Sequence, residues 1–288
     1  MSTENYIAAR TLEEALACLA QGDASILAGG TDLMPQSRAG RVKLARTLLY
    51  IGNIAELRGI SEVAGGGLRI GALTTITELL DSEQIRARAP MLRQAADQFA
   101  SDQVRNAATV GGNICNASPA GDTLPPLLAL GAKLELASKP NGTATVRSLP
   151  IEEFFSGPGR SVKKPEELLT AVFLPAPKAN AVSRFYKFGT RPALDISTVS
   201  IALAGVLDQG RLSNVRLAFG AVAATPLRAR QTEAALEGKM LDAATIAAAA
   251  AAARNEVKPI DDVRASAWYR QELVHNMTQR MLSHVAEA

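Results

Sequence analysis

The feature that most constrains this chain is the stretch from Thr109 to Asp122, which reads TVGGNICNASPAGD. Its paired glycines, Gly111 and Gly112, allow a tight turn or the close approach of a ligand to the backbone. Short polar side chains surround the glycines, and an apolar run follows at Leu124 to Leu130. This composition favours successive backbone N–H groups wrapped around an anion, as in a phosphate site. An ordinary surface turn is the alternative.

A second glycine turn lies near the start of the chain, where Ser25 to Asp32 reads SILAGGTD. A short apolar strand leads into Gly29-Gly30, and the next two residues can cap a helix. Strand, glycine turn and helix start together present N–H groups and a helix dipole to a phosphate. Neither stretch has the lysine of a P-loop or the spacing G-x-G-x-x-G. Two unrelated glycine loops therefore indicate a nucleotide whose diphosphate is bound by neither a P-loop nor a G-x-G-x-x-G motif.

The two motifs together resemble the FAD-binding subunit of the xanthine dehydrogenase family, which includes the medium subunits of carbon monoxide dehydrogenase and other molybdenum hydroxylases. The resemblance starts with AGGTDL at Ala28 to Leu33 and runs in order through nearly the whole chain. Further matching segments are Phe154-Phe155, PEELL at Pro165 to Leu169, FYKFGTRPALDIS at Phe185 to Ser197, GAVAATPLRA at Gly220 to Ala229, and SAWYR at Ser266 to Arg270.

The resemblance implies an α+β fold with a two-lobed FAD-binding domain of the vanillyl-alcohol-oxidase (PCMH-like) type. We expect this domain over residues 1–175, with lobes at about 1–57 and 58–175. A smaller domain at 176–288 is expected to hold a three-stranded antiparallel sheet and a helical bundle. The boundary is indicated by PAPKAN at Pro175 to Asn180, where two prolines stand among small and polar residues.

Periodicity and turn residues predict the elements within these domains. A helix at Thr11 to Ala20 stands before strands at Ser25 to Ala28 and Thr47 to Ile51. The second lobe has helices at Thr74–Leu80 and Ser82–Phe99, broken near Pro90, and a hairpin that turns at Pro140-Asn141-Gly142. The C-terminal domain has strands at Ser183–Phe188, Ser197–Leu207 and Arg211–Val222, and helices from Thr225, at Ala243–Ala253 and at Arg264–Ala286.

The function that the resemblance implies is electron transfer through noncovalently bound FAD, in one subunit of an oxidoreductase of the xanthine dehydrogenase type. A large partner subunit would carry the molybdenum cofactor, and a small one would carry [2Fe-2S] clusters. The three would form a heterotrimer, alone or dimerised. Electrons would pass from the clusters through FAD to an external acceptor.

The resemblance also assigns cofactor contacts residue by residue. The redox chemistry takes place on FAD, so no catalytic side chain is expected. Leu169 matches a residue that flanks the isoalloxazine ring, and Lys187 and Asp195 fall in the segment that approaches the flavin, where Lys187 would tune its potential. The other expected contacts are Leu27, Ala28, Gly29, Gly30, Thr31, Asp32 and Leu33 in the first loop, and Ala108, Thr109, Gly111, Gly112, Asn113, Cys115, Gly121 and Asp122 in the second.

Simpler structural interpretations stand beside three of these assignments. Asp122 can cap a helix that starts near Thr123, and Lys187 can be a solvated strand residue. Cys115 can be a packed thiol that does not face the cofactor.

Composition excludes several other functions. The two cysteines, Cys18 and Cys115, are too few for an iron–sulfur cluster or a cysteine zinc site, and Cys18 suits a helix core. His275 and His284 fall in a terminal helix without metal-ligand spacing, so no metal site is expected. A net charge of +3 is too slight to indicate nucleic-acid binding. No apolar run is long enough to span a membrane, and the sequence points to the cytoplasm.

Two other functions stay open. A stand-alone FAD-dependent reductase or oxidase on the same fold, as in the peptidoglycan-precursor reductases, would need its own substrate site with a proton donor. A non-enzymatic assembly module would use the glycine loops only as tight turns. A flavin absorbance spectrum separates the module from the flavoproteins, and copurification with a large molybdenum subunit separates the other two.

Overall fold

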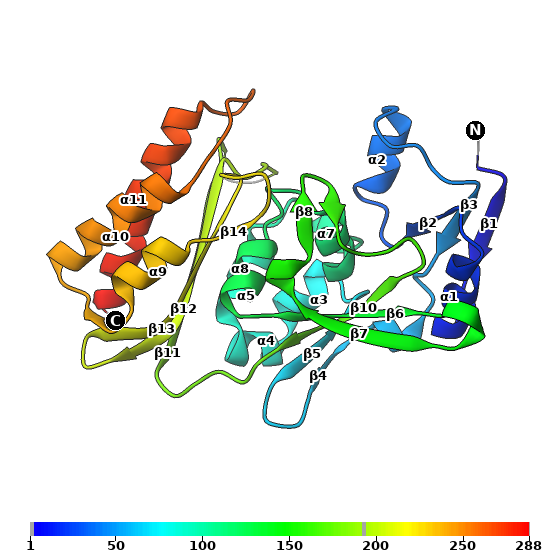
Figure 1. The fold of residues 1–288 in the computed structure, drawn as a ribbon, viewed down its shortest axis with the longest axis horizontal. Coiled ribbons are helices and arrows are strands. Elements are labelled where there is room, and N and C mark those ends of the chain that lie inside the picture. The colour runs from blue at the N-terminus through cyan, green and yellow to red at the C-terminus, as the bar shows by residue number, and fades with distance from the viewer. Residues whose placement is uncertain (1–2, 192–193, 288) are drawn as a thin grey trace.

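The computed structural model describes residues 3–191 and 194–287. Three main sheets lie one after another along the long axis of the molecule, in the order of the sequence (Figure 1). We call the parts built on them the N-terminal lobe, the central lobe and the C-terminal part.

The N-terminal lobe is a three-stranded parallel sheet with one helix packed on it. Its strands β1 (Asn5–Ala8), β2 (Ala24–Leu27) and β3 (Thr47–Tyr50) lie in the order β1-β3-β2. Helix α1 (Leu12–Ala20) begins where the Thr11 hydroxyl accepts the Glu14 N–H, and it buries Cys18 in the lobe's core. A short helix, α2 (Leu33–Arg38), follows the first glycine loop. The exposed strand β1 carries no apolar alternation that would have predicted it.

The central lobe is an antiparallel sheet in the order β4-β5-β10-β6-β7, beside which its helices pack around the largest core. The predicted helix break at Pro90 and the hairpin at residues 140–142 are confirmed; Asn141 and Gly142 adopt the left-handed backbone that this turn requires. The elements are η1 (Ala55–Leu57), β4 (Ile60–Glu62), β5 (Leu68–Gly71), α3 (Ile76–Asp81), α4 (Glu83–Arg88), α5 (Pro90–Asp97), α6 (Asp102–Arg105), α7 (Val110–Asn116), α8 (Leu124–Ala129), β6 (Lys133–Ser138), η2 (Pro140–Gly142), β7 (Thr145–Pro150), η3 (Ile151–Glu153), β8 (Phe155–Gly157), β9 (Arg160–Ser161) and β10 (Leu168–Leu174).

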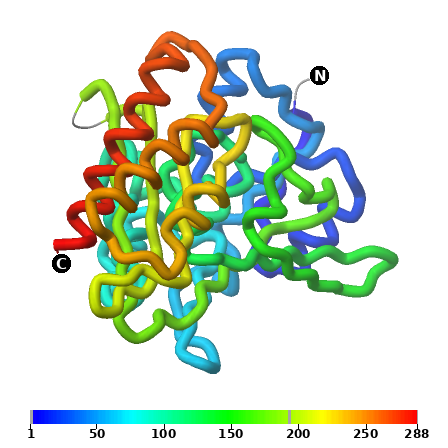
Figure 2. Tube along the Cα trace, turned by 60° about the vertical axis from the view of Figure 1, so that its left-hand side comes forward, coloured from blue at the N-terminus to red at the C-terminus, as the bar shows by residue number. Residues whose placement is uncertain are grey.

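The C-terminal part contains the three predicted long strands in antiparallel order, with helices on the outer face of their sheet (Figure 2). The helix expected from Thr225 is wrong, because residues 227–228 instead pair with β13 and the helix begins at Arg230. The elements are β11 (Ala181–Phe188), β12 (Val199–Asp208), β13 (Arg211–Gly220), β14 (Leu227–Arg228), α9 (Arg230–Leu236), β15 (Lys239–Met240), α10 (Ala243–Glu256) and α11 (Ala267–Ala286).

This C-terminal sheet is buried on both faces. Because side chains alternate along a strand, Ile201 and Leu203 pack into the core under the helices, while Ala202 packs into the core of the central lobe. The edge of β11 is covered as well, since α5 lies along it and the Gln94 side-chain oxygen accepts the Phe185 N–H at 2.9 Å. The sheet is therefore the wall that the central lobe and the C-terminal helices share.

Arg270 ties α11 to this sheet. Its side chain is 4% exposed and donates to the carbonyls of Thr198 and Ala221 at 2.8 and 2.7 Å, and to Asp262 at 2.7 Å. Although burial raises the pKa of Asp262, hydrogen bonds from Arg264 N–H and Arg270 outweigh that effect and lower the pKa to about 2.

Replacing Arg270 should therefore destabilise the C-terminal part. We expect Arg270→Met to lower the free energy of unfolding by about 3 kcal/mol, because it leaves the Thr198 and Ala221 carbonyls without this donor and removes the cation that pairs with Asp262. Asp262→Asn should lower the free energy of unfolding by less than Arg270→Met does, and the size of this decrease should depend on pH. The ionised carboxylate stabilises the fold fully above its ordinary pKa of 3.8 and loses this contribution as the pH falls towards about 2. Urea unfolding of wild type and Asp262→Asn at several pH values measures this; a stability gap that does not narrow with falling pH contradicts it.

Candidate cofactor site

The first glycine loop is in direct backbone contact with the segment that leads into the second motif. A Cβ atom added to Gly29 would overlap the carbonyl of Ala107, just before the second motif, so only glycine allows this approach. A cavity of about 440 Å³ opens at the contact, lined by residues 27–30 of the first loop and by Thr109 of the second motif. Sequence reasoning predicted that the loops act together, and the structure brings them to one cavity.

Other segments complete this cavity, and sequence reasoning missed them. Tyr50 comes from the end of β3, Arg58 follows η1, and Asn106 precedes the second motif. The Arg58 guanidinium donates to the Gly52 carbonyl at 2.8 Å, which fixes the position of its charge at the wall. No local pattern marks these residues, because chain segments far apart in the sequence bring them together.

The first loop offers unused hydrogen-bond donors. Among the residues that the structure describes, the backbone N–H groups of Gly29, Gly30, Thr31 and Asp32 have no acceptor within hydrogen-bond distance. Gly30 has φ of +69°, and a left-handed residue in such a loop turns neighbouring N–H groups to the same side. The Asp32 side chain accepts from Gln36, and Leu33 begins α2. This loop therefore has the donors that a diphosphate requires.

The second motif has a different local structure from the expected one. The paired glycines form the first turn of α7, which the Thr109 hydroxyl caps through the Gly112 N–H at 3.0 Å. Val110 and Gly111 donate to the carbonyls of Thr74 and Ala72 at 3.0 and 2.8 Å. The nest of free amides predicted here is therefore wrong, because the protein itself uses these donors.

The two glycines of α7 instead have separate structural consequences: Gly111 allows close packing, and Gly112 leaves backbone exposed at the surface. A Cβ at Gly111 would lie 2.7 Å from the Ala72 Cβ, so Gly111 allows α7 to meet the end of β5. Gly112 is exposed, and a Cβ there would meet only the Thr109 hydroxyl, at 2.9 Å. Gly112 therefore presents bare backbone outward beside the cavity that Thr109 lines.

Asp122, at the other end of the motif, forms a buried ion pair with Lys187. Its carboxylate accepts from the Lys187 ammonium at 2.7 Å and from the Ser197 hydroxyl at 2.5 Å, and the two charged side chains are only 9% and 8% exposed. Lys187 also donates to the Gln98 carbonyl at 2.9 Å. Burial raises the pKa of Asp122, and the ammonium opposes this shift. Asp122 therefore does not cap α8, and Lys187 is not a solvated strand residue.

Lys187 lines a second cavity, of about 380 Å³, with Gln98 and the residues that follow β11. In that wall the Asp195 carboxylate accepts from the Thr190 hydroxyl at 2.9 Å and from the Arg191 N–H at 3.3 Å. Burial raises the pKa of Asp195, but these bonds lower it overall. The motif from Thr109 to Asp122 thus joins the two cavities: its first residue lines one, and its last holds the lysine of the other.

The remaining expected contacts line neither of the two cavities. Leu169 is packed in the central core, and Ala108 and Gly121 are buried. Asn113 accepts from the Thr123 hydroxyl at 2.6 Å. Cys115 is half-buried against the same core, and burial raises the pKa of its thiol to about 11, which agrees with a packed structural cysteine.

Within residues 3–191 and 194–287, no three His, Cys, Asp or Glu side chains gather closely enough to hold a metal ion. His284 lies far from both glycine loops in the sequence and pairs with the Tyr186 hydroxyl at 2.5 Å. No helix in this part of the chain has the length and apolar character needed to cross a membrane.

Known proteins similar to this chain share both of its halves. Residues 2–177 match the family described as the FAD binding domain in molybdopterin dehydrogenase, and residues 184–285 match the CO dehydrogenase flavoprotein C-terminal domain. The xanthine dehydrogenase FAD-binding subunit of Escherichia coli O157:H7 is 39% identical, over 99% of this chain and 96% of its own length. The carbon monoxide dehydrogenase medium chain of Hydrogenophaga pseudoflava is 34% identical over 96% and 95%. A solved structure of that dehydrogenase contains a chain with a TM-score of 0.90 and 33% identity, over 97% and 96%.

A side chain at Gly112 should prevent cofactor binding without unfolding the protein. Gly112 is exposed, so Gly112→Val fills space outside the protein core and meets only the Thr109 hydroxyl. We expect soluble, folded protein that lacks flavin, measured by absorbance after purification and by far-UV circular dichroism. Gly157→Val is the matched control, since Gly157 lies in β8 and a Cβ there would meet only the Arg160 side chain, at an ordinary contact distance of 3.9 Å. Normal flavin content in Gly112→Val would remove this turn from the site.

Proposed function

The chain belongs to the family of FAD-binding medium subunits of xanthine and carbon monoxide dehydrogenases, and we propose that it is the electron-transferring FAD subunit of a molybdenum hydroxylase. The observation that carries this proposal is the pair of cavities joined by one motif. An extended dinucleotide needs a place for its diphosphate and another for its ring, and the two cavities would serve as these places.

The residues of the two cavities fit FAD. The free amides of Gly29 to Asp32 would hold the diphosphate, with the exposed backbone at Gly112 beside it. The flavin ring would lie in the cavity of Lys187, where Phe188 offers an aromatic face. Bound there, FAD supplies the electron storage that no side chain can provide. The chain's own residues position the cofactor and set the charge around it.

The proposed complex also contains a large subunit with the molybdenum cofactor and a small subunit with iron–sulfur clusters. Electrons would reach the flavin from the small subunit and leave to an external acceptor, and the three subunits would form a heterotrimer, alone or dimerised. The family membership supports this division of labour. Cys18 and Cys115 are free thiols in the structure, which supports the cytoplasm as the compartment.

The proposed domain division follows the sheets. A FAD-binding domain would occupy residues 1–175, with lobes at about 1–57 and 58–175, and a C-terminal domain would occupy residues 176–288. The gap between the two matched family segments, at residues 178–183, supports a boundary near Pro175. The start of β11 at Ala181 supports it as well.

A stand-alone reductase or oxidase would need a proton donor in the flavin cavity. The titratable groups lining that cavity within the described residues are Lys187, Arg191 and Asp195. The Asp195 carboxyl has a lowered pKa, and the Arg191 guanidinium donates to the Leu194 carbonyl. Lys187 is held by Asp122. None of these three groups is placed to donate a proton to a substrate, so the lining of the cavity favours the subunit function.

Affinity purification of the tagged chain from its native cells tests the assignment. We expect a flavin absorbance spectrum and copurification of a large molybdenum-containing subunit with a small iron–sulfur subunit. The chain purified alone should retain flavin that artificial reductants can reduce, yet it should hydroxylate no substrate. Substrate hydroxylation by the metal-free chain would contradict the subunit function, and a colourless protein would contradict FAD binding.

We further propose that Lys187 raises the reduction potential of the flavin, because a nearby cation stabilises added negative charge. Lys187→Met should lower the midpoint potential by tens of millivolts, since about 1.4 kcal/mol corresponds to ~30 mV in a two-electron couple. Asp122→Asn removes the opposite charge and should raise the potential, while Lys187→Arg should leave it nearly unchanged. Spectroelectrochemical titration of flavin-loaded variants measures these shifts. Shifts of the same sign in Lys187→Met and Asp122→Asn would show that charge is not the cause.

A further inference from the structure

The charges in and around the second cavity balance one another. Within the described part of the chain, the charged residues that line this cavity are Lys187, Arg191 and Asp195. The Lys187 ammonium also pairs with Asp122 at 2.7 Å, so two cations stand against two carboxylates. A molecule that gains a negative charge in this cavity would find no spare cation there. It would therefore compete with Asp122 for the charge of Lys187.

Asp195, one of the two carboxylates, is held in its ionised form by several donors. It accepts from the Thr190 hydroxyl at 2.9 Å, and from the N–H groups of Arg191 and Ile196 at 3.3 and 2.9 Å. Although burial raises the pKa of Asp195, these bonds lower it overall. An N–H group cannot accept a hydrogen bond from a protonated carboxyl, so adding a proton to Asp195 would weaken this set of bonds.

Asp122, the other carboxylate, is more deeply buried and has fewer donors. Within the described residues both of its donors are side chains, the Lys187 ammonium and the Ser197 hydroxyl. Burial raises the pKa of Asp122, its two donors oppose this shift, and the negative charge of Asp195 raises the pKa further. A new negative charge in the cavity would act in the same direction as Asp195. Asp122 is therefore the carboxylate that binds a proton first when the cavity becomes more negative.

The contacts of Asp122 allow its carboxyl to be protonated in place. A serine hydroxyl can both donate and accept, so Ser197 can accept a hydrogen bond from the protonated carboxyl after donating one to the ionised form. Lys187 stays bonded to the Gln98 carbonyl at 2.9 Å. An ammonium has three N–H donors, so one remains for a group in the cavity beside those that bind Asp122 and Gln98. Protonation therefore releases the charge of Lys187 without requiring its side chain to move.

Resting on the proposed function, we propose that Asp122 binds a proton each time the flavin is reduced. Two electrons from the iron–sulfur clusters of the small subunit, with one proton from water, convert bound FAD to an anion. The Lys187 Nζ passes a proton to the Asp122 Oδ2 that it contacts, and takes another from water in the cavity. In sum, two electrons and two protons enter, and both protons leave when the flavin is reoxidised. The positive charge of Lys187 then stabilises the flavin anion, because Asp122 is neutral.

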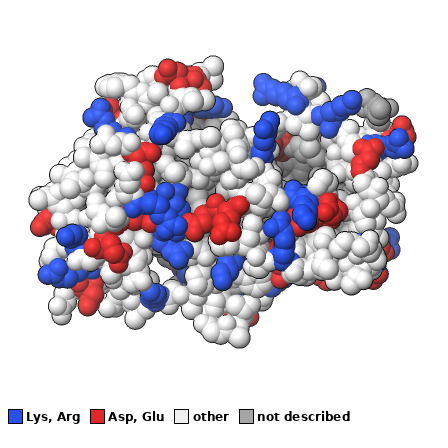
Figure 3. All heavy atoms as spheres, in the orientation of Figure 1, with Lys and Arg blue, Asp and Glu red and all other residues white. Residues whose placement is uncertain are grey.

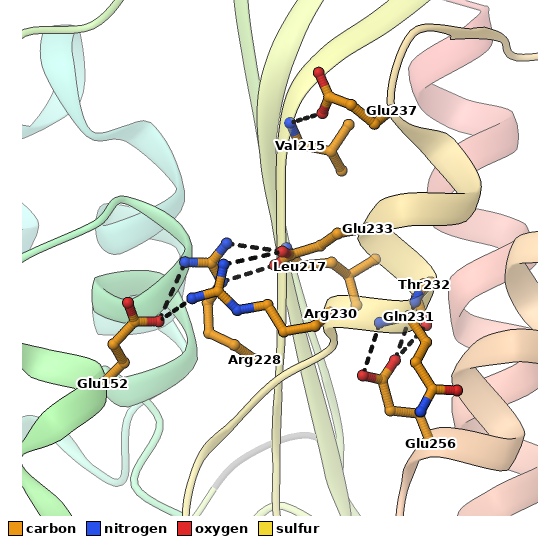
Figure 4. A network of polar contacts seen from close by, with 10 residues as sticks. All are labelled: Glu152, Val215, Leu217, Arg228, Arg230, Gln231, Thr232, Glu233, Glu237 and Glu256. Carbon is orange, nitrogen blue, oxygen red and sulfur yellow. Dashed lines mark hydrogen bonds and ion pairs between the residues drawn. The ribbon is translucent and has the colours of Figure 1, made fainter.

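A second ion-pair network between the central lobe and the C-terminal sheet offers a control. In Figure 4, Glu152 points from the central lobe towards Arg228 and Arg230, with which it pairs at 3.3 and 2.7 Å. Figure 3 shows basic side chains beside acidic ones over the region where Figure 1 draws β14 and α8. None of these three residues lines either cavity. Glu152→Gln therefore removes a carboxylate charge between the same two parts of the chain without changing the flavin cavity.

The pH dependence of the flavin midpoint potential tests the proposal. Each proton bound on two-electron reduction makes the potential fall by ~30 mV per pH unit, because a tenfold change in concentration corresponds to ~30 mV. We expect a fall of up to ~60 mV per pH unit in the wild type and in Glu152→Gln, but of ~30 mV in Asp122→Asn, which binds one proton fewer. The potentials of wild type and Asp122→Asn should converge as the pH falls, since Asp122 is then protonated in both redox states.

Two further measurements do not depend on the folding of Asp122→Asn. Ser197→Ala keeps the carboxylate but removes a donor to its ionised form, so the steep part of the curve should move to higher pH. Reduced-minus-oxidised infrared spectra of the wild type should gain a protonated-carboxyl band that shifts in heavy water. Flavin content and thermal unfolding confirm that each variant is folded and loaded.

The outcomes separate this inference from the proposed function. Equal slopes in wild type and Asp122→Asn, or a wild type without the carboxyl band, overturn the proton uptake at Asp122 while the flavin subunit stands. A slope that decreases equally in Glu152→Gln and Asp122→Asn overturns the assignment to Asp122. A wild-type chain that binds no flavin overturns the proposed function as well.

Discussion

The rest of the structure depends on a buried ion pair, between Asp122 of the central lobe and Lys187 of the C-terminal sheet. Either charge alone at such a place would cost several kcal/mol, so the two halves of the chain satisfy each other only in one relative position. That position also puts the lysine into the wall of the second cavity. The position of the C-terminal sheet on the central lobe and the charge in the wall of that cavity are therefore set by one contact, which the Ser197 hydroxyl and the Gln98 carbonyl complete.

Two kinds of glycine work together at the first cavity. Gly29 and Gly111 allow backbones to touch, because a side chain at either would collide with Ala107 or Ala72. Gly30 instead supplies a left-handed backbone that leaves neighbouring amides free. In the proposed diphosphate site the two tasks would thus be divided: one loop would offer the donors, and the segment around the other motif would support that loop. A single glycine-rich loop combines both tasks in the familiar nucleotide-binding frameworks.

Local chemistry explains which features the sequence could predict. The helix start at Thr11, the break at Pro90 and the turn at Asn141-Gly142 depend on residues a few positions apart, and all three are found. The amides of the second motif were misjudged because two of their acceptors, the carbonyls of Ala72 and Thr74, lie on the segment that follows β5, which no local pattern reveals. Tyr50, Arg58 and Asn106 were missed for the same reason. At Thr225, pairing with β13 outweighed a good capping sequence.

The covered edge of β11 has a consequence for how the chain is made. Strand edges left open attract other strands, and β11 is the first strand of its sheet to be synthesised. Its covering helix, α5, precedes it by more than eighty residues, so this helix leaves the ribosome well before the edge does. Folding from the N-terminus therefore shields the sheet during translation. The order of segments in the gene protects the nascent chain from aggregation, and a gene rearranged to begin at β11 would lose that protection.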